Sequence, residues 1–157
     1  MSSQKRVLFV CLGNICRSPL AEGIFRHHVE HAGREQNFVI DSAGTSGWHA
    51  GEMPDKGSIR VAQSRGIDIR AQRSRKLIAE DFDNFDFIVA MDQSNIKKIR
   101  EVREPKEGQV LLMRAYDAER SGQDVPDPWS HGDEAFQEVF DLLAGCMDNL
   151  LAYLDQN

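Results

Sequence analysis

The feature that most constrains this chain is a short apolar strand that leads directly into a loop and then into a helix. The stretch begins at Val7 and ends at Glu22, with the sequence Val-Leu-Phe-Val-Cys-Leu-Gly-Asn-Ile-Cys-Arg-Ser-Pro-Leu-Ala-Glu. Backbone N–H groups of a loop that feeds a helix N-terminus converge on one point, where the helix dipole also favours negative charge. The stretch therefore predicts an anion-binding loop between the first strand and the first helix.

Two side chains of this loop add chemistry to the anion site. Cys11 is the first loop residue, and a helix N-terminus and a nearby arginine both stabilise a cysteine thiolate. Arg17 provides a planar, two-pronged donor that suits phosphate oxygens. The alternatives are a small buried cysteine at a strand end and an exposed arginine at a helix start. The loop and its spacing favour the reactive pair, and a phosphate held above a thiolate indicates phosphoryl transfer to sulfur.

Length and composition indicate one compact domain. The chain has 157 residues, of which 41% are hydrophobic, so we expect residues 1–157 to form a single domain with its own core. The net charge of −6 disfavours a general affinity for nucleic acid or for an anionic membrane. The sequence shows no leader and no apolar run of about 18–20 residues, so we expect a cytoplasmic protein without membrane insertion.

The three cysteines do not form a disulfide or zinc pattern. Their number is odd, and none has the Cys-x2-Cys spacing of zinc sites. We therefore expect reduced thiols and no metal site. Because Arg17 and the loop N–H groups already neutralise a phosphate, we expect no cofactor either.

Strands and helices alternate along the chain. Short apolar runs predict strands, and apolar residues three or four apart with capping residues predict helices. The predicted strands are residues 5–10, 37–42, 85–91 and 110–113. The predicted helices are residues 18–33, 55–66, 92–103 and 133–154. This order predicts a three-layer α/β fold, in which a four-stranded parallel sheet carries helices on both faces and a phosphate-binding loop follows the first strand.

A candidate acid lies in the long connection between the fourth strand and the last helix. Residues 114–132 contain Asp124-Val-Pro-Asp127-Pro-Trp129, and a connection of this length is more often functional than a plain solvated loop. Ligands of parallel sheets lie outside the carboxyl ends of the strands, and both this connection and Cys11 follow such an end. A phenolate or another alkoxide leaves phosphorus far more easily when it is protonated as the P–O bond breaks. Asp127 is therefore the candidate general acid, and a turn-forming residue beside proline is the alternative.

The motif Cys11-x5-Arg17-Ser18, with the longer string Cys-Leu-Gly-Asn-Ile-Cys-Arg-Ser-Pro-Leu-Ala-Glu, resembles the low-molecular-weight protein tyrosine phosphatases. The resemblance implies hydrolysis of phosphotyrosine in proteins through a phosphocysteine intermediate. It implies that Cys11 is the nucleophile, that Arg17 and the loop N–H groups bind phosphate, and that Asp127 is the general acid and base. The implied partner is a phosphotyrosine-containing protein, for which bacterial members suggest a tyrosine kinase of polysaccharide export, and the implied product is inorganic phosphate.

The remaining loop residues are expected to bind the phosphate or to hold the loop in shape. Ser18 is predicted as the helix N-cap and, by the resemblance, as a stabiliser of the thiolate. Asn14 is expected in a left-handed conformation that keeps successive N–H groups pointing inward. The resemblance implies that Ser42 braces Asn14, and that Gln72 stands where many members have a histidine in this network. The expected phosphate-binding residues are thus Leu12, Gly13, Asn14, Ile15, Cys16 and Ser18.

An aryl phosphate requires apolar walls beside the phosphate loop. The candidate wall residues are Leu12, Ile15, Trp48 and Trp129. Burial in the core is the alternative for each, but one tryptophan lies in a glycine-rich loop and the other follows the Asp-Pro pair. Vertebrate members carry paired tyrosines after Asp-Pro, whereas Trp129-Ser130 stands here. We therefore expect a bacterial-type member without control by tyrosine phosphorylation.

Cys16 lies five residues after Cys11 and has two interpretations. It is either a small packed side chain or a resolving thiol. In the second case, a sulfenic acid formed at Cys11 would be trapped as a reversible disulfide rather than oxidised further.

Three other functions are compatible with parts of the sequence. A thiol-dependent arsenate reductase on the same scaffold needs two further cysteines, and none lies between Ser74 and Asp92. A protein-arginine phosphatase has threonine where this loop has Ile15. A non-enzymatic phosphate-binding module needs neither Cys11 nor Asp127. These differences favour phosphotyrosine hydrolysis and leave the physiological substrate open.

Overall fold

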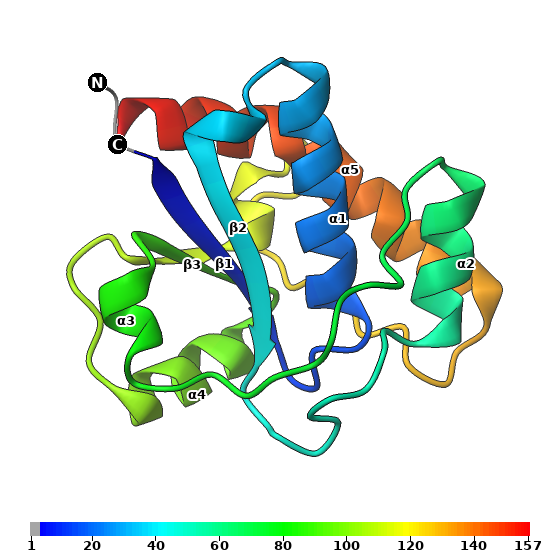
Figure 1. The fold of residues 1–157 in the computed structure, drawn as a ribbon, viewed down its shortest axis with the longest axis horizontal. Helices are drawn as coiled ribbons and strands as arrows, with labels where there is room; N and C mark the ends of the chain where they lie inside the picture. Colours follow the sequence, from blue (N-terminus) through cyan, green and yellow to red (C-terminus); the bar gives the residue numbers. More distant parts are fainter. Residues whose placement is uncertain (1–3) are drawn as a thin grey trace.

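The computed structural model describes residues 4–157 and has three layers. A parallel sheet of four strands forms the middle layer, and helices cover both of its faces (Figure 1). The strands are β1 (Lys5–Cys11), β2 (Phe38–Gly44), β3 (Phe87–Ala90) and β4 (Val110–Leu112). Their order in the sheet is β2-β1-β3-β4. The predicted α/β fold is confirmed.

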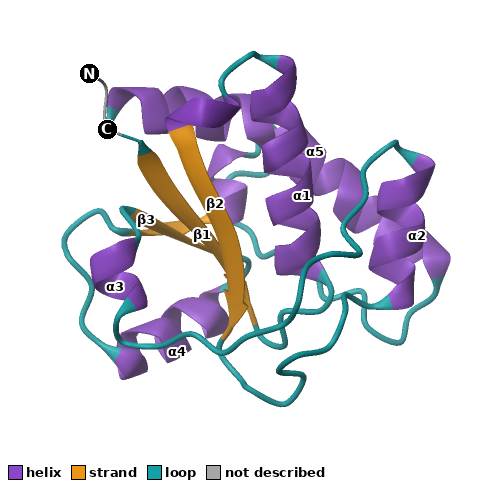
Figure 2. Ribbon diagram, in the orientation of Figure 1, coloured by secondary structure: helices purple, strands orange, loops and turns teal. Residues whose placement is uncertain are grey.

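Helices α1, α2 and α5 lie on one face of the sheet, and α3 and α4 lie on the other (Figure 2). The helices are α1 (Arg17–His31), α2 (Lys56–Ser64), α3 (Asp81–Asn84), α4 (Gln93–Val102) and α5 (Asp133–Gln156). Two short 3-10 helices are η1 (Glu35–Asn37) and η2 (Met113–Tyr116). Within residues 4–157, no helix combines the length and the apolar character needed to cross a membrane.

β1 is a central strand, and both of its faces are buried. It pairs in parallel with β2 on one side and with β3 on the other. Because side chains alternate across a strand, Val7 and Phe9 join the core beneath α1 and α5, whereas Leu8 and Val10 join the core beneath α3 and α4. Burial on both faces explains the continuous apolar run that precedes Cys11.

The strand order reverses beside β1, and the phosphate loop follows the carboxyl end of this strand. In open α/β sheets, ligands bind outside the carboxyl ends of the strands at such a switch point. Here the backbone N–H of Met91, just after β3, donates to Val10 O at 3.1 Å. The backbone N–H of Thr45, just after β2, donates to Cys11 O at 2.9 Å. The loops that follow three strands therefore meet around Cys11.

The structure differs from the sequence-based prediction in local detail. α1 begins at Arg17 with Cys16 at its N-cap, so the prediction that Ser18 caps the helix is wrong. The reason is that the Ser18 hydroxyl bonds to loop side chains instead of to the helix backbone. α3, η1 and η2 were not predicted, because three or four residues are too few to show helical periodicity. Asp92 caps α4 as predicted.

Close packing between α2 and α5 gives a test of the fold. A Cβ at Gly57 would lie 2.5 Å from Phe136 Cε2, so Gly57→Ala should lower the free energy of unfolding by about 1–3 kcal/mol. A Cβ at Gly145, inside α5, would meet no atom within 4 Å. Gly145→Ala should therefore raise the stability by about 0.5–1 kcal/mol. Urea unfolding of both variants checks this, and equal effects would contradict the packing.

Candidate active site

The loop of residues 12–16 joins β1 to α1 and is fixed from behind by the segment after β2. Thr45 N donates to Cys11 O, and Ser46 N donates to Leu12 O at 2.9 Å. These bonds continue the parallel pairing of β1 and β2 into the loop. The first loop residues therefore have a fixed position relative to the sheet.

Asn14 connects the loop to three other parts of the molecule. Its φ is 55°, the left-handed conformation predicted for it. Its Nδ2 donates to Ser18 Oγ at 2.8 Å and to Ser42 Oγ at 3.0 Å. Its Oδ1 accepts from the backbone N–H of Arg75 at 3.0 Å. This buried amide therefore ties the loop to α1, to β2 and to the segment before α3.

The thiol of Cys11 has a hydroxyl neighbour. Ser18 Oγ lies 3.1 Å from Cys11 Sγ, and both side chains are buried. Because Ser18 Oγ accepts a hydrogen bond from Asn14, its own proton is free to point at the sulfur. This is the geometry that a hydroxyl needs in order to stabilise a thiolate.

A buried carboxylate, not anticipated from the sequence, continues this network. Ser42 Oγ donates to Glu22 Oε1 at 2.7 Å, and Arg26 donates to Glu22 Oε2 at 3.0 Å. Burial raises the pKa of Glu22, although the hydrogen bonds from Ser42 and Arg26 oppose this shift. The sequence signal was the spacing of four between Ser18 and Glu22, which puts both residues on one buried face of α1.

Gln72 lies outside this network. Its Nε2 donates to Pro19 O at 3.1 Å, and its Oε1 is buried without a hydrogen-bond partner among residues 4–157. Glu22 rather than Gln72 holds the hydroxyl of Ser42. Among the described residues, Gln72 makes no hydrogen bond to Asn14, Ser18 or Ser42, so the bracing contact expected for it is not observed.

Arg17 is 3% exposed and is held by groups from distant segments. Its Nη1 donates to Asp92 Oδ2 at 2.7 Å and to Val125 O at 2.9 Å, and its Nη2 lies 3.9 Å from Asp127 Oδ2. Burial opposes the charged form, but the surrounding Cys11, Asp92 and Asp127 raise the pKa of the guanidinium. Arg17 is therefore a fixed, permanent cation beside the thiol.

Asp92 has two roles, of which the sequence predicted one. Its Oδ1 accepts from Asn95 N at 2.7 Å and caps α4. Its Oδ2 accepts from Arg17. The carboxylate that starts α4 therefore also orients the cation of the phosphate loop.

Asp127 is brought to the loop by anchors on the residues just before it. Val125 N donates to Met91 O at 2.8 Å, and Asp124 Oδ1 accepts from Gln93 N at 3.0 Å. The Asp127 side chain is 47% exposed. Its Oδ1 accepts from Trp129 N at 3.1 Å, and its Oδ2 faces Arg17. The carboxylate of the candidate acid therefore lies beside the guanidinium of Arg17.

Cys11, Arg17 and Asp127 line one pocket of about 170 Å³. The exposed fractions of Trp48 and Trp129 are 87% and 57%, so burial in the core, the alternative for both tryptophans, is wrong. Asn14, Ser18 and Ser42 lie behind the loop. The pocket is lined by Cys11, Leu12, Gly13, Ile15, Cys16, Arg17, Ser46, Trp48, His49, Asp127 and Trp129.

Cys16 lines the same pocket as Cys11. Burial and the neighbouring Asp55 raise its pKa well above the ordinary value of a thiol. Asp55 is close because its N–H donates to Ile15 O at 2.7 Å. Cys16 is therefore held as a neutral thiol.

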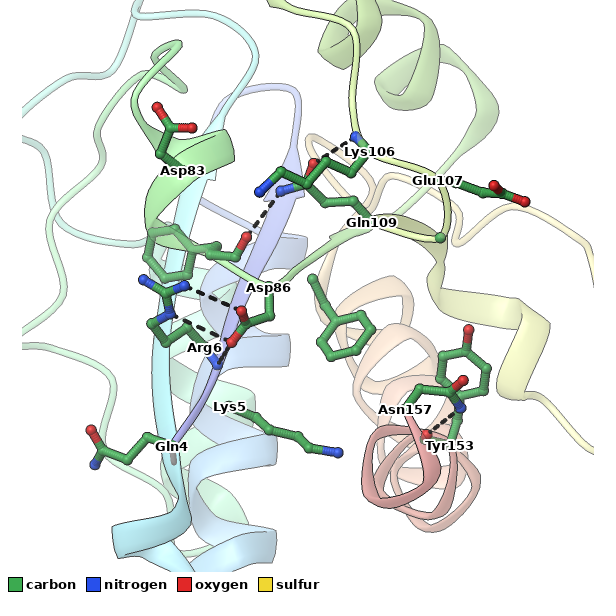
Figure 3. Close-up of a pocket in the computed structure, with 13 residues that line it drawn as sticks. Gln4, Lys5, Arg6, Asp83, Asp86, Lys106, Glu107, Gln109, Tyr153 and Asn157 are labelled. Atoms are coloured by element: carbon green, nitrogen blue, oxygen red, sulfur yellow. Dashed lines mark hydrogen bonds and ion pairs between the residues drawn. The ribbon is translucent and has the colours of Figure 1, made fainter. Parts of the chain in front are cut away.

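A larger hollow lies at the amino end of the strands, away from Cys11. Its volume is about 680 Å³, and two ion pairs involve charged side chains of its lining. Figure 3 shows Arg6 against Asp86, at 3.2 Å. Asp83 pairs with Arg103. Within residues 4–157, no group of three or more His, Cys, Asp or Glu side chains is placed to hold a metal ion.

Comparison with known proteins agrees with this geometry. The family model "Low molecular weight phosphotyrosine protein phosphatase" matches residues 6–157. The chain belongs to this family. Members of the family hydrolyse phosphotyrosine, and the loop that carries Cys11 and Arg17 is present here.

Relatives of both eukaryotic and bacterial origin cover nearly the whole chain. A low molecular weight phosphotyrosine protein phosphatase of Schizosaccharomyces pombe is 42% identical over 153 residues, which are 96% of this chain and 97% of that protein. The crystal structure of YfkJ from Bacillus subtilis has a TM-score of 0.91 at 38% identity and covers 98% of this chain and 96% of that one. A protein tyrosine phosphatase of Entamoeba histolytica with Hepes in the active site has a TM-score of 0.90 at 33% identity, covering 98% of both chains.

The raised pKa of Glu22 predicts a specific dependence of stability on pH. A carboxyl group whose pKa in the folded state lies above its ordinary value of 4.5 stabilises the fold fully below that pH. This contribution is lost as the pH rises through the folded-state pKa. Glu22→Gln should therefore gain stability relative to wild type between pH 4 and pH 7. Urea unfolding at both values tests this, with Glu30→Gln on the exposed face of α1 as control, and parallel profiles for all three proteins would contradict it.

Proposed function

We propose that this protein hydrolyses phosphotyrosine in proteins through a phosphocysteine intermediate. The observation that carries the proposal is the meeting of Cys11, Arg17 and Asp127 in one pocket with aromatic walls. In the proposed roles, Cys11 is the nucleophile, Arg17 and the loop N–H groups bind the phosphoryl oxygens, and Asp127 is the general acid and base.

In the first step, the thiolate of Cys11 attacks phosphorus as the bond to the tyrosine oxygen breaks. Asp127 gives its proton to the leaving tyrosine oxygen, so that a neutral phenol leaves in place of a phenolate anion. The charge that develops on the phosphoryl oxygens is stabilised by Arg17, whose orientation is fixed by Asp92 and the Val125 carbonyl. Ser18 supports the thiolate before the attack and again when sulfur leaves.

In the second step, water attacks the phosphocysteine. Asp127, now a carboxylate, takes a proton from this water as the sulfur–phosphorus bond breaks. The thiolate of Cys11 is regenerated and inorganic phosphate is released. One carboxyl group thus serves both halves of the reaction, and its position opposite Arg17 suits both.

The pocket supports an aryl ester rather than the rival substrates. Leu12, Ile15, Trp48 and Trp129 offer apolar and aromatic surface beside the thiol, which suits a phenyl ring. Ile15 stands where a protein-arginine phosphatase has threonine. The chain lacks the further cysteines that an arsenate reductase uses between Ser74 and Asp92.

Three finer assignments belong to the same proposal. We place residues 1–157 in one phosphatase domain, which the match over residues 6–157 supports. We propose a cytoplasmic location, since Cys11, Cys16 and Cys146 are free thiols and such thiols persist in a reducing compartment. The partner is a phosphotyrosine-containing protein, for which a tyrosine kinase is the candidate.

Leaving-group dependence tests the acid. Asp127→Asn should lower kcat/KM, which reports the step that forms the phosphocysteine, by about one hundred- to ten-thousand-fold for phenyl phosphate. The loss should be smaller for p-nitrophenyl phosphate, because its phenolate leaves without protonation. Cys11→Ser should have no turnover with either substrate, whereas Asp133→Asn, at the exposed start of α5, is the matched control. Equal losses for the two substrates in Asp127→Asn would contradict the role of Asp127.

We also propose that Cys16 resolves oxidation of Cys11, since both thiols line the same pocket. Peroxide converts Cys11 to a sulfenic acid, and the Cys16 thiol then forms a disulfide with release of water. Wild type inactivated by peroxide should recover with dithiothreitol, and Cys16→Ser should recover less. Recovery of phosphatase activity measures this, and equal recovery would leave Cys16 as a packing residue only.

A further inference from the structure

The mouth of the pocket carries a histidine that the proposed mechanism does not use. His49 lines the pocket beside Trp48, and its Nδ1 lies 2.6 Å from Glu52 Oε2. Because an ionised carboxylate only accepts hydrogen bonds, Nδ1 carries the proton and Nε2 is the ring nitrogen left for another molecule. A Cβ at Gly13 would lie 3.1 Å from His49 Cδ2 and 3.8 Å from Nε2. This edge of the ring therefore faces the phosphate loop.

The turn that carries His49 and Glu52 is fixed to the same loop. Glu52 N donates to His49 O at 2.9 Å, and Ser74 N donates to Glu52 O at 2.8 Å. Ser74 is buried, and its Oγ donates to Gly13 O at 3.0 Å. The position of the imidazole relative to the phosphate loop is thus defined by two contacts. Ser74 connects the backbone of the turn to Gly13, and the Glu52 carboxylate binds the imidazole ring.

The size of the pocket corresponds to a single aromatic ring. Its volume is about 170 Å³, and a cavity of about 150 Å³ is known to accept a benzene ring. Residues that flank the phosphotyrosine must therefore stay outside, at the rim. His49 and the largely exposed Trp48 stand at this rim.

The charges around the rim make His49 the group that decides whether an acidic flanking residue is accepted. The other charged groups that line the pocket are Asp127, Arg17 and the thiolate of Cys11, and Glu52 lies on the turn of His49 itself. Arg17 is buried and already paired. Lys76 packs against Gly47, next to Trp48, but does not line the pocket. Among the groups that line the pocket, a protonated His49 is therefore the cation that is not already buried and paired.

We propose that His49 is a specificity-determining residue that binds an aspartate or glutamate next to the phosphotyrosine. The inference rests on the proposed phosphatase function. In the imidazolium, Nδ1–H donates to Glu52 and Nε2–H donates to the substrate carboxylate. In the neutral ring Nε2 is an acceptor, so only the imidazolium offers both donors.

The test compares two phosphotyrosine peptides that differ only in Asp or Asn beside the phosphotyrosine. The measured quantity is the ratio of kcat/KM for the Asp peptide to that for the Asn peptide. His49→Gln should lower this ratio by about threefold to fivefold, the effect of one exposed charge pair. His49→Lys keeps a cationic donor at this position and should therefore preserve the ratio. His31→Gln is the matched control, since this exposed histidine bonds only to its own helix at His27 O.

Turnover of p-nitrophenyl phosphate, which has no flanking residues, separates the outcomes. If His49→Gln lowers this turnover as much as that of the Asp peptide, His49 acts on the phosphate or the ring and the inference is overturned. An unchanged Asp-to-Asn ratio in His49→Gln overturns it as well. If wild type turns over none of the three substrates, the proposed function itself fails and the inference fails with it.

Discussion

The buried cation of Arg17 is the interaction on which the rest of the site depends. Its guanidinium joins the phosphate loop to Asp92 at the start of α4 and to Val125 in the loop before α5. One side chain therefore positions both the start of α4 and the loop before α5. A buried charge is costly unless it is paired, so these contacts with Arg17 favour the folded arrangement of the two segments around the phosphate loop. A phosphoryl group bound there would meet donors that are already oriented.

The side of the phosphate loop that faces away from the pocket is held by hydrogen bonds between uncharged side chains, and the last of these side chains donates to the carboxylate of Glu22. Asn14 joins Ser18 and Ser42, and Ser42 in turn donates to Glu22. All four residues of this network are buried, so the loss of any one hydrogen bond would leave a buried polar group without a partner and would lower the stability. The network therefore defines the shape of the loop. The front of the loop therefore remains free for substrate, while its shape is determined from behind.

The fold and the reactive groups were predictable from the sequence because they depend on local signals. Cys11, Arg17 and the strand before them form one continuous stretch, and Asp127 stands out between two prolines. The roles of Glu22 and His49 were not predictable. Each depends on a partner brought close only by folding. The spacing of four from Ser18 indicates the face of α1 on which Glu22 lies but not its partner Ser42, and no sequence pattern marks His49.

By itself, the sequence determined the order of strands and helices, the anion loop and the thiol, because alternating apolar runs and a loop at a strand end have few other solutions. The tertiary structure decided which side chains act on that loop. Of the two roles predicted for Ser18, it kept the contact with the thiol and not the helix cap. It also joined Glu22 to Ser42 and directed the amide of Gln72 to the backbone of Pro19. The physical reason is that a buried polar group bonds to a suitable partner that lies close in space. That partner can be far away in the sequence, so the spacing of residues does not predict it.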